Sequence, residues 1–328
     1  MYPALAAATA SYSYTTILLA ALPVFAVTGI AFALRWKGKW EEKGDGPLLW
    51  MLVHVFFPCL LFRLVTGNPE LMNPLEVVWP PLVGFSLIIL GFIVAWLIAG
   101  WMGLKVGAGR RTFAFAVGIF NYGYMAIPLV EALFPGNKTT GVLVVHNLGI
   151  EMAVWTVGIM LVSGEFAKGF VSKLMNPPAM ALLLGLVANF TGLYQYVPTW
   201  LDRTIGFFGN CGIPVGLILA GGTLAEVVKA GDWRENARVP VMGVVLRLML
   251  LPILFLVVAS LLPASLQELR RVVIVQAAMP AGMLPIVLAK HYGGEPRVAV
   301  QVVVATTVVA FFTMPLWIQI GLGLIGEG

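Results

Sequence analysis

Two stretches of this 328-residue chain place proline and glycine beside polar or sulfur-containing side chains within otherwise apolar sequence. They are Asn121–Pro128 and Ala278–Pro285. Proline removes a backbone donor and clashes with the preceding helical turn, while glycine lowers the cost of unwinding. Each stretch is therefore predicted to break a helix in two. Backbone exposed in this way must line a cavity or be buried in protein, and the N-termini of the half-helices would attract an anion.

The residues of these two breaks are the candidate substrate-binding residues. Asn121 is the first of them, because its amide offers both a donor and an acceptor to a carboxylate and to unwound backbone. A simple kink is the alternative for one proline alone, but two prolines in corresponding positions favour a site. The candidates are Asn121, Tyr122, Gly123 and Pro128 in the first break and Met279, Pro280, Gly282 and Pro285 in the second.

Ionisable and amide side chains within apolar sequence are candidates for ion coupling. Glu151, with Asn147 one helical turn earlier on the same face, is the first candidate for H⁺ or Na⁺. A hydrogen-bonded carboxyl that joins helices is the structural alternative. His146 could titrate near neutral pH or act as a neutral hydrogen-bonding group. Gln276 and Gln301 are secondary contacts in the same set.

The elements that hold these residues must be membrane helices. Hydrophobic residues make up 60% of the chain, charged residues 11%, and the mean hydropathy is +0.94. A helix of about 20 apolar residues spans a bilayer core of about 30 Å. Ten apolar segments follow one another: 14–34, 47–66, 75–101, 112–133, 140–162, 177–194, 204–227, 239–262, 269–289 and 298–325. The sequence therefore predicts an all-α, multi-pass integral membrane protein.

The positive charges predict the orientation of these segments. Fourteen Lys and Arg lie in the connections after odd-numbered segments, against four on the opposite side. Because cytoplasmic loops are enriched in positive residues, the odd-numbered connections are expected in the cytoplasm and both termini outside a plasma (inner) membrane. The net charge of +5 then reflects orientation, and no nucleic-acid partner is expected.

Five segments in each half require the two halves to have inverted orientations. A weak internal repeat agrees with this, since Pro128 aligns with Pro285 and Gly136 with Gly293. We expect a single transmembrane domain of two inverted five-helix repeats, 14–162 and 177–325. Helices four and nine would be the broken ones, crossing at the centre.

Several of these motifs resemble the auxin efflux carrier family along essentially the whole chain. They include Asn121–Pro128, with its pattern N-x-G-Y-x-x-I-P, together with Ala277–Pro280, Ala289–Gly294 and Thr313–Trp317. The resemblance implies a fold shared with the bile acid/sodium symporters. It also implies organic anions as substrates, such as auxins and small dicarboxylates.

The same resemblance implies a division of labour between two sets of helices. Segments 14–66 and 177–227 would form a scaffold, and segments 75–162 and 239–325 a transport domain that carries the site across the membrane as an elevator. Two departures from the family pattern bear on the substrate. Ala126 stands where the family often has Gly, and no second Asn occurs near Leu284.

The expected function is secondary active transport of an organic anion, with H⁺ or Na⁺ coupling open. A sodium-coupled bile acid-type symporter and an anion channel are the alternatives. An enzyme is not expected, because the three Asp residues lie in or beside loops, and no metal site or cofactor is indicated. The lipid bilayer is a partner by composition, and a homodimer through the scaffold helices is left open.

Two further features concern packing. Arg247 lies within a predicted span, where an unpaired cation is unfavourable, so it is expected to pair with a carboxylate or backbone carbonyls. Gly206, Gly209, Gly212 and Gly216 form a stripe that would permit close helix approach. A sliding surface, a dimer surface and ordinary tight packing are its three interpretations.

Overall fold

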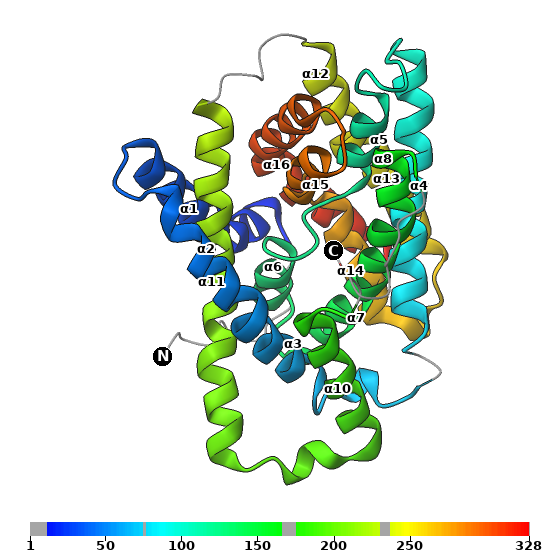
Figure 1. The fold of residues 1–328 in the computed structure, drawn as a ribbon. Helices are drawn as coiled ribbons and strands as arrows, with labels where there is room; N and C mark the ends of the chain where they lie inside the picture. Colours follow the sequence, from blue (N-terminus) through cyan, green and yellow to red (C-terminus); the bar gives the residue numbers. More distant parts are fainter. Residues whose placement is uncertain (1–11, 75–76, 166–174, 230–236, 328) are drawn as a thin grey trace.

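A computed structural model describes residues 12–74, 77–165, 175–229 and 237–327, and this part of the chain is all helix and loop (Figure 1). Each of the ten predicted apolar segments contains helix. Lys168, Lys173 and Arg234, which entered the charge count, lie outside the described residues, as does Asp232.

The described helices divide between the two halves of the chain. The first half contains α1 (Tyr14–Trp36), α2 (Asp45–Met51), α3 (Phe57–Val65), α4 (Trp79–Trp101), α5 (Arg110–Gly118), α6 (Ala126–Leu133), α7 (Asn137–Ala153) and α8 (Ile159–Ser163). The second contains α10 (Pro177–Thr191), α11 (Thr199–Lys229), α12 (Arg238–Val245), α13 (Leu251–Leu261), α14 (Gln267–Ala278), α15 (Leu284–His291) and α16 (Pro296–Leu324). Single π-helical turns join α2 to α3, α7 to α8 and α12 to α13.

Within the described residues, seven continuous helical stretches are long and apolar enough to cross a membrane. They are Tyr14–Trp36, Glu42–Val65, Trp79–Trp101, Asn137–Ser163, Thr199–Lys229, Arg238–Leu261 and Pro296–Leu324. The helix α10 is apolar but shorter. The two remaining predicted segments, 112–133 and 269–289, each form a pair of short helices: α5 with α6, and α14 with α15. Exposed Trp79 and Trp101 stand at the two ends of α4, as is common at the two faces of a bilayer.

The helices form two bundles. We call α1–α3, α10 and α11 the side bundle, in which α1 packs along α11 and α3 packs against both α10 and α11. The helices α4–α8 and α12–α16 form the main bundle, where α4 packs against α5 and α7, and α14 against α13 and α16. Figure 1 shows α1 and α11 side by side at one edge of the molecule. The grouping follows the predicted scaffold and transport domain, whose separate movement stays a prediction.

The glycine stripe of α11 is used inside the chain. Gly206, Gly209 and Gly212 face Arg63, Leu60 and Phe57 of α3, so tight packing accounts for these three positions. Gly216 instead faces Tyr124 of the main bundle.

The helices α5 and α14 enter the main bundle from opposite ends of α4. The first residue of α5, Arg110, lies against Gly100 near the end of α4, whereas Glu268 at the start of α14 shares a small pocket with Pro80 at the beginning of α4. Both helices then end near the middle of the bundle.

Reciprocal hydrogen bonds fix these two entry points. The backbone N–H of Glu295, just before α16, donates to Thr112 Oγ1 in α5 at 2.8 Å. The hydroxyl of Thr139, near the start of α7, donates to the carboxylate of Glu268 in α14. Each half of the chain thus anchors the first half-helix of the other.

Close packing of α4 on α7 depends on Gly149, which is buried in α7. A Cβ atom there would lie 1.8 Å from the backbone oxygen of Pro81. We expect Gly149→Ala to destabilise the protein by about 1–3 kcal/mol, as overpacking does. Gly29→Ala is the control, because a Cβ atom at Gly29 meets nothing within 4 Å. Thermal unfolding of the purified proteins should show a lower midpoint for the first variant only; equal midpoints would contradict this packing.

Candidate functional site

Both expected helix breaks are present, but each lies before its proline. The chain leaves helical geometry between α5 and α6 over Ile119–Met125, and between α14 and α15 over Met279–Met283. Pro128 is the third residue of α6 and Pro285 the second of α15. Proline is tolerated in the first turn because the N–H groups there have no intrahelical partner. The prolines therefore start the second half-helices.

The two breaks pair with each other through their backbones. The N–H of Asn121 donates to the carbonyl oxygen of Pro280 at 2.8 Å. The N–H of Gly282 donates to the carbonyl oxygen of Ile119 at 2.9 Å. The pairing is antiparallel. Non-helical backbone at membrane depth must satisfy its polar groups within the protein. Each break therefore supplies backbone hydrogen-bond partners that the other has lost from its helix.

A cavity of about 160 Å³ lies beside this pairing. Most of its lining comes from the first break, with Gly282 from the second break, Leu284 from the start of α15 and Phe57 from the side bundle. Aromatic rings and a single carboxylate dominate the wall. The lining residues are Phe57, Ile119, Phe120, Asn121, Tyr122, Gly123, Tyr124, Glu151, Gly282 and Leu284.

Glu151 reaches the cavity from α7 and is held by two donors. The hydroxyl of Tyr122 donates to Oε1 at 2.5 Å, and the indole N–H of Trp155 donates to Oε2 at 2.7 Å. These bonds fix the carboxyl group against the first break.

Asn147 faces the first break as well, as its spacing from Glu151 predicts. Its Nδ2 donates to the backbone oxygen of Tyr122 at 2.9 Å, and its Oδ1 accepts from Nε2 of Gln276 at 3.0 Å. Asn147 therefore links α7 to both broken helices. Asn121 Oδ1 accepts from the backbone N–H of Met125, at the N-terminus of α6.

Arg247 is fully buried and binds backbone carbonyls, one of the two partners expected for it. Its Nε donates to the oxygen of Met279 at 2.9 Å, and Nη2 donates to those of Gln276 and Ala277 at 3.0 and 3.1 Å. A cation at a helix C-terminus opposes the negative end of the helix dipole. The guanidinium also lies over the ring of Phe120, 4.8 Å from its centroid, so it contacts both breaks.

The remaining predicted residues do not line the cavity. His146 is buried in α7 against Gly84 of α4, and Gln301 is buried in α16. Met279 and Pro280 contribute their carbonyl oxygens to Arg247 and Asn121.

The predicted residues did not include four aromatic residues of the site, Phe57, Phe120, Tyr124 and Trp155. Phe120 directly precedes Asn121 and Tyr124 directly follows Gly123, so the sequence offered a signal for both. The contacts of Phe57 and Trp155 depend on helix packing, and nothing in their local sequence reveals them.

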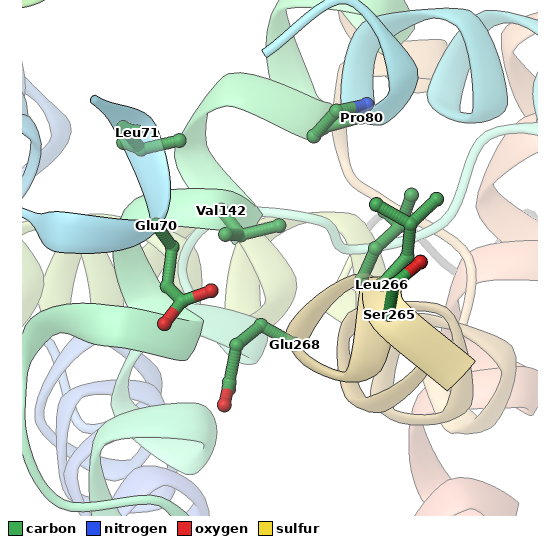
Figure 2. A pocket seen from close by; sticks show the side chains of 8 residues that line it. Glu70, Leu71, Pro80, Val142, Ser265, Leu266 and Glu268 are labelled. Carbon is green, nitrogen blue, oxygen red and sulfur yellow. The ribbon is translucent and has the colours of Figure 1, made fainter. Parts of the chain in front are cut away.

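A second, smaller pocket of about 30 Å³ lies where the residues after α3 meet α4, α7 and the start of α14 (Figure 2). It contains Glu70 and Glu268, but both carboxylates have partners. Lys138 pairs with Glu70 at 3.1 Å, and Arg271 pairs with Glu268 at 2.8 Å. Within the described residues, no group of three or more His, Cys, Asp or Glu side chains could hold a metal ion. The larger cavity is therefore the better candidate site.

Comparison with known proteins agrees with this architecture. A family model described as membrane transport protein matches residues 16–169 and again 167–318. The chain belongs to this family, that of the auxin efflux carriers. The match in two halves indicates an internal repeat.

Two curated relatives span most of the chain. An uncharacterized transporter of Methanothermobacter thermautotrophicus is 23% identical over 303 residues, covering 90% of this chain and 95% of the relative. One of Methanocaldococcus jannaschii is 20% identical over 275 residues, covering 81% and 86%. The protein is thus a multi-pass integral membrane transporter and not an enzyme, which confirms the expected resemblance.

Replacing Arg247 by Met should destabilise the protein, because hydrogen bonds from a charged group are worth about 1.5–3 kcal/mol each. Arg63→Met is the matched control, since Arg63 is exposed near the end of α3. Fluorescence-detected size exclusion after heating would compare the two. A melting profile of the Arg247 variant that matches the control would show that the carbonyl contacts do not stabilise the break.

Proposed function

We propose that this protein is a secondary active transporter that carries a small organic anion across the plasma (inner) membrane by an elevator movement. The observation that carries the proposal is the antiparallel pairing of two helix breaks beside a cavity lined by Asn121. Paired half-helices at membrane depth are typical of secondary transporters and place fixed dipoles around a central site.

The proposed topology is ten spans in two inverted repeats, 14–162 and 177–325, with both termini outside. Its support is the entry of α5 and α14 from opposite ends of α4 and the antiparallel register of the two breaks. The reciprocal anchoring of α5 and α14 is what a two-fold relation between the repeats requires. Inverted repeats give a transporter two related conformations, open to either side.

In the elevator movement, the main bundle slides along the side bundle and carries the cavity with it. A homodimer through the side bundle would hold the scaffold still. Its surface would exclude Gly206, Gly209 and Gly212, because these face α3 of the same chain.

We assign substrate binding to the residues of the two breaks. Asn121, Tyr122, Gly123 and Gly282 line the cavity, and Leu284 brings the N-terminus of α15 to it. The carboxylate of the substrate would accept hydrogen bonds from the Asn121 amide and from N–H groups at these helix starts. Pro128, Pro285, Met279 and Pro280 would act indirectly, by starting the half-helices or supplying carbonyl oxygens.

Glu151 gives the site a charge that can change. A carboxylate beside an anionic substrate is strongly repelled in a low-dielectric cavity, so we propose that Glu151 is protonated when the substrate binds. Tyr122 and Tyr124 are the other titratable groups in the lining, and Arg247 lies behind Phe120. Proton and anion would then travel together. Asn147 and Gln276 would fix the position of the first break beside Glu151. His146 and Gln301 are more distant coupling candidates. Na⁺ bound to an ionised Glu151 is the alternative to proton coupling.

The lining also supports a second candidate, a small organic cation. Four aromatic rings, those of Phe57, Phe120, Tyr122 and Tyr124, surround the cavity with one carboxylate. Aromatic faces and a carboxylate are the groups that bind ammonium ligands. The two candidates predict opposite pH dependence, because the cation requires Glu151 to be ionised.

Asn121→Ala should abolish saturable uptake while leaving the protein folded, since it removes the polar side chain of the break that faces the substrate. Proteoliposomes would be tested with a panel of indole and aliphatic carboxylates, with and without Na⁺ or pH gradients. Asn210→Ala, at an exposed position of α11, is the control and should transport normally. Wild-type transport by the Asn121 variant would refute the assigned site.

Glu151→Gln should remove the pH dependence of uptake. In the wild-type protein, uptake of the carboxylate should increase as pH falls on the substrate side, because protonation removes the repelling charge. The Gln variant is neutral at every pH and should transport at a rate independent of pH. Glu165→Gln, exposed beyond the end of α8, should behave as wild type.

Three results would decide against proton coupling through Glu151. Unchanged pH-driven uptake by the Gln variant would exclude it directly. Uptake that depends on Na⁺ but not on pH would favour the sodium alternative. Wild-type uptake of organic ammonium ions that rises with pH and disappears in the Gln variant would favour the cation.

A further inference from the structure

The cavity touches the side bundle at one pair of aromatic rings. Phe57 of α3 is the side-bundle residue in its lining, and Tyr124 of the first break stacks on it. The ring centroids are 5.5 Å apart and the planes are inclined by 27°. The boundary between the two bundles therefore runs along the wall of the proposed substrate site.

The same tyrosine ring lies against a glycine of a second side-bundle helix. A Cβ atom built at Gly216 of α11 would fall 2.2 Å from Tyr124 Cε1 and 2.3 Å from Cδ1. Side-chain atoms do not approach this closely, so only glycine at this position leaves room for the ring. Tyr124 thus sits in a seat formed by Gly216 on one side-bundle helix and Phe57 on another.

Gly212, one turn earlier on α11, provides the comparison. A Cβ atom there would meet its nearest neighbours, Phe57 and Leu60, at 3.4 and 3.5 Å, which is ordinary van der Waals contact. Both glycines are buried in the same helix, yet only Gly216 contacts the main bundle this tightly. The close approach at Gly216 is therefore specific to the seat.

We propose that Tyr124 is the positioning residue that couples the substrate cavity to the side bundle, with Gly216 and Phe57 as its seat in this conformation. The inference rests on the proposed elevator movement, in which the main bundle must slide along α3 and α11. Tyr124 belongs to the moving part and lines the cavity, so the ring has to leave the seat whenever the cavity moves. While the Tyr124 ring lies against Gly216 and Phe57, it holds the cavity wall against the side bundle.

Substitution at the seat tests the coupling. Gly216→Ala should reduce saturable uptake at least tenfold, because the added methyl group displaces the ring, whereas Gly212→Ala should stay within twofold of wild type. In a Tyr124→Ala background, Gly216→Ala should cause no further loss, since the two positions act through one contact. Equal loss from Gly216→Ala with and without the tyrosine would overturn the proposal.

A reversible crosslink separates coupling from folding. Two cysteines can be crosslinked when their side chains come within reach of each other, and a Cβ atom at Gly216 would lie 2.2 Å from the ring of Tyr124. Tyr124→Cys and Gly216→Cys would be combined after both native cysteines, Cys59 and Cys211, are replaced by Ser. The reduced double variant should transport more slowly than wild type, because it lacks the Tyr124 ring. Oxidation should form the crosslink and stop the uptake that remains, and a reducing agent should restore it to the level before oxidation; the single-cysteine variants should not respond to oxidation.

The outcomes distinguish this inference from the proposed function. A crosslink that forms without changing uptake would refute the coupling role of Tyr124 alone. Absence of saturable uptake by the wild-type protein would refute the proposed function and the coupling role with it. Reversible inhibition confined to the double-cysteine protein supports both.

Discussion

Antiparallel hydrogen bonding between two interrupted helices is the constraint on which the rest of this molecule depends. Asn121 donates to Pro280 and Gly282 donates to Ile119. In hydrocarbon, each unpaired backbone group costs several kcal/mol, so neither break would be stable if the other were absent. The need to pair them brings α5, α6, α14 and α15 to one place. The unwound residues then form most of the cavity wall, which a continuous helix could not offer.

Two ionisable side chains near this pairing, Arg247 and Glu151, have different surroundings. Arg247 donates from Nε and Nη2 to three carbonyl oxygens around the end of α14, so its charge stabilises the break. Glu151 lies in the wall of the cavity and is held by Tyr122 and Trp155. Under the proposed function, a cation that supports the backbone and an acid that can gain a proton would together give a site whose preference for charge follows pH.

Hydropathy was sufficient to predict every apolar segment, because membrane helices need long apolar runs irrespective of their partners. The sequence also predicted that Arg247 binds a carboxylate or backbone carbonyl groups, since a cation within a membrane span needs a partner. The exact limits of the breaks did not follow, because Pro128 and Pro285 start the second half-helices and each break is set by where the other backbone can pair with it. The seat of Tyr124 on Gly216 could not be predicted either, because it joins segments that are distant in sequence.

The most direct test of the central claim is an experimental structure in lipid nanodiscs, solved with a carboxylate that shows saturable uptake. We expect the ligand's carboxylate within hydrogen-bonding distance of the Asn121 amide, with the bonds from Asn121 to Pro280 and from Gly282 to Ile119 intact. Ligand density elsewhere in the protein, or a helix that continues from α5 into α6, would contradict the account.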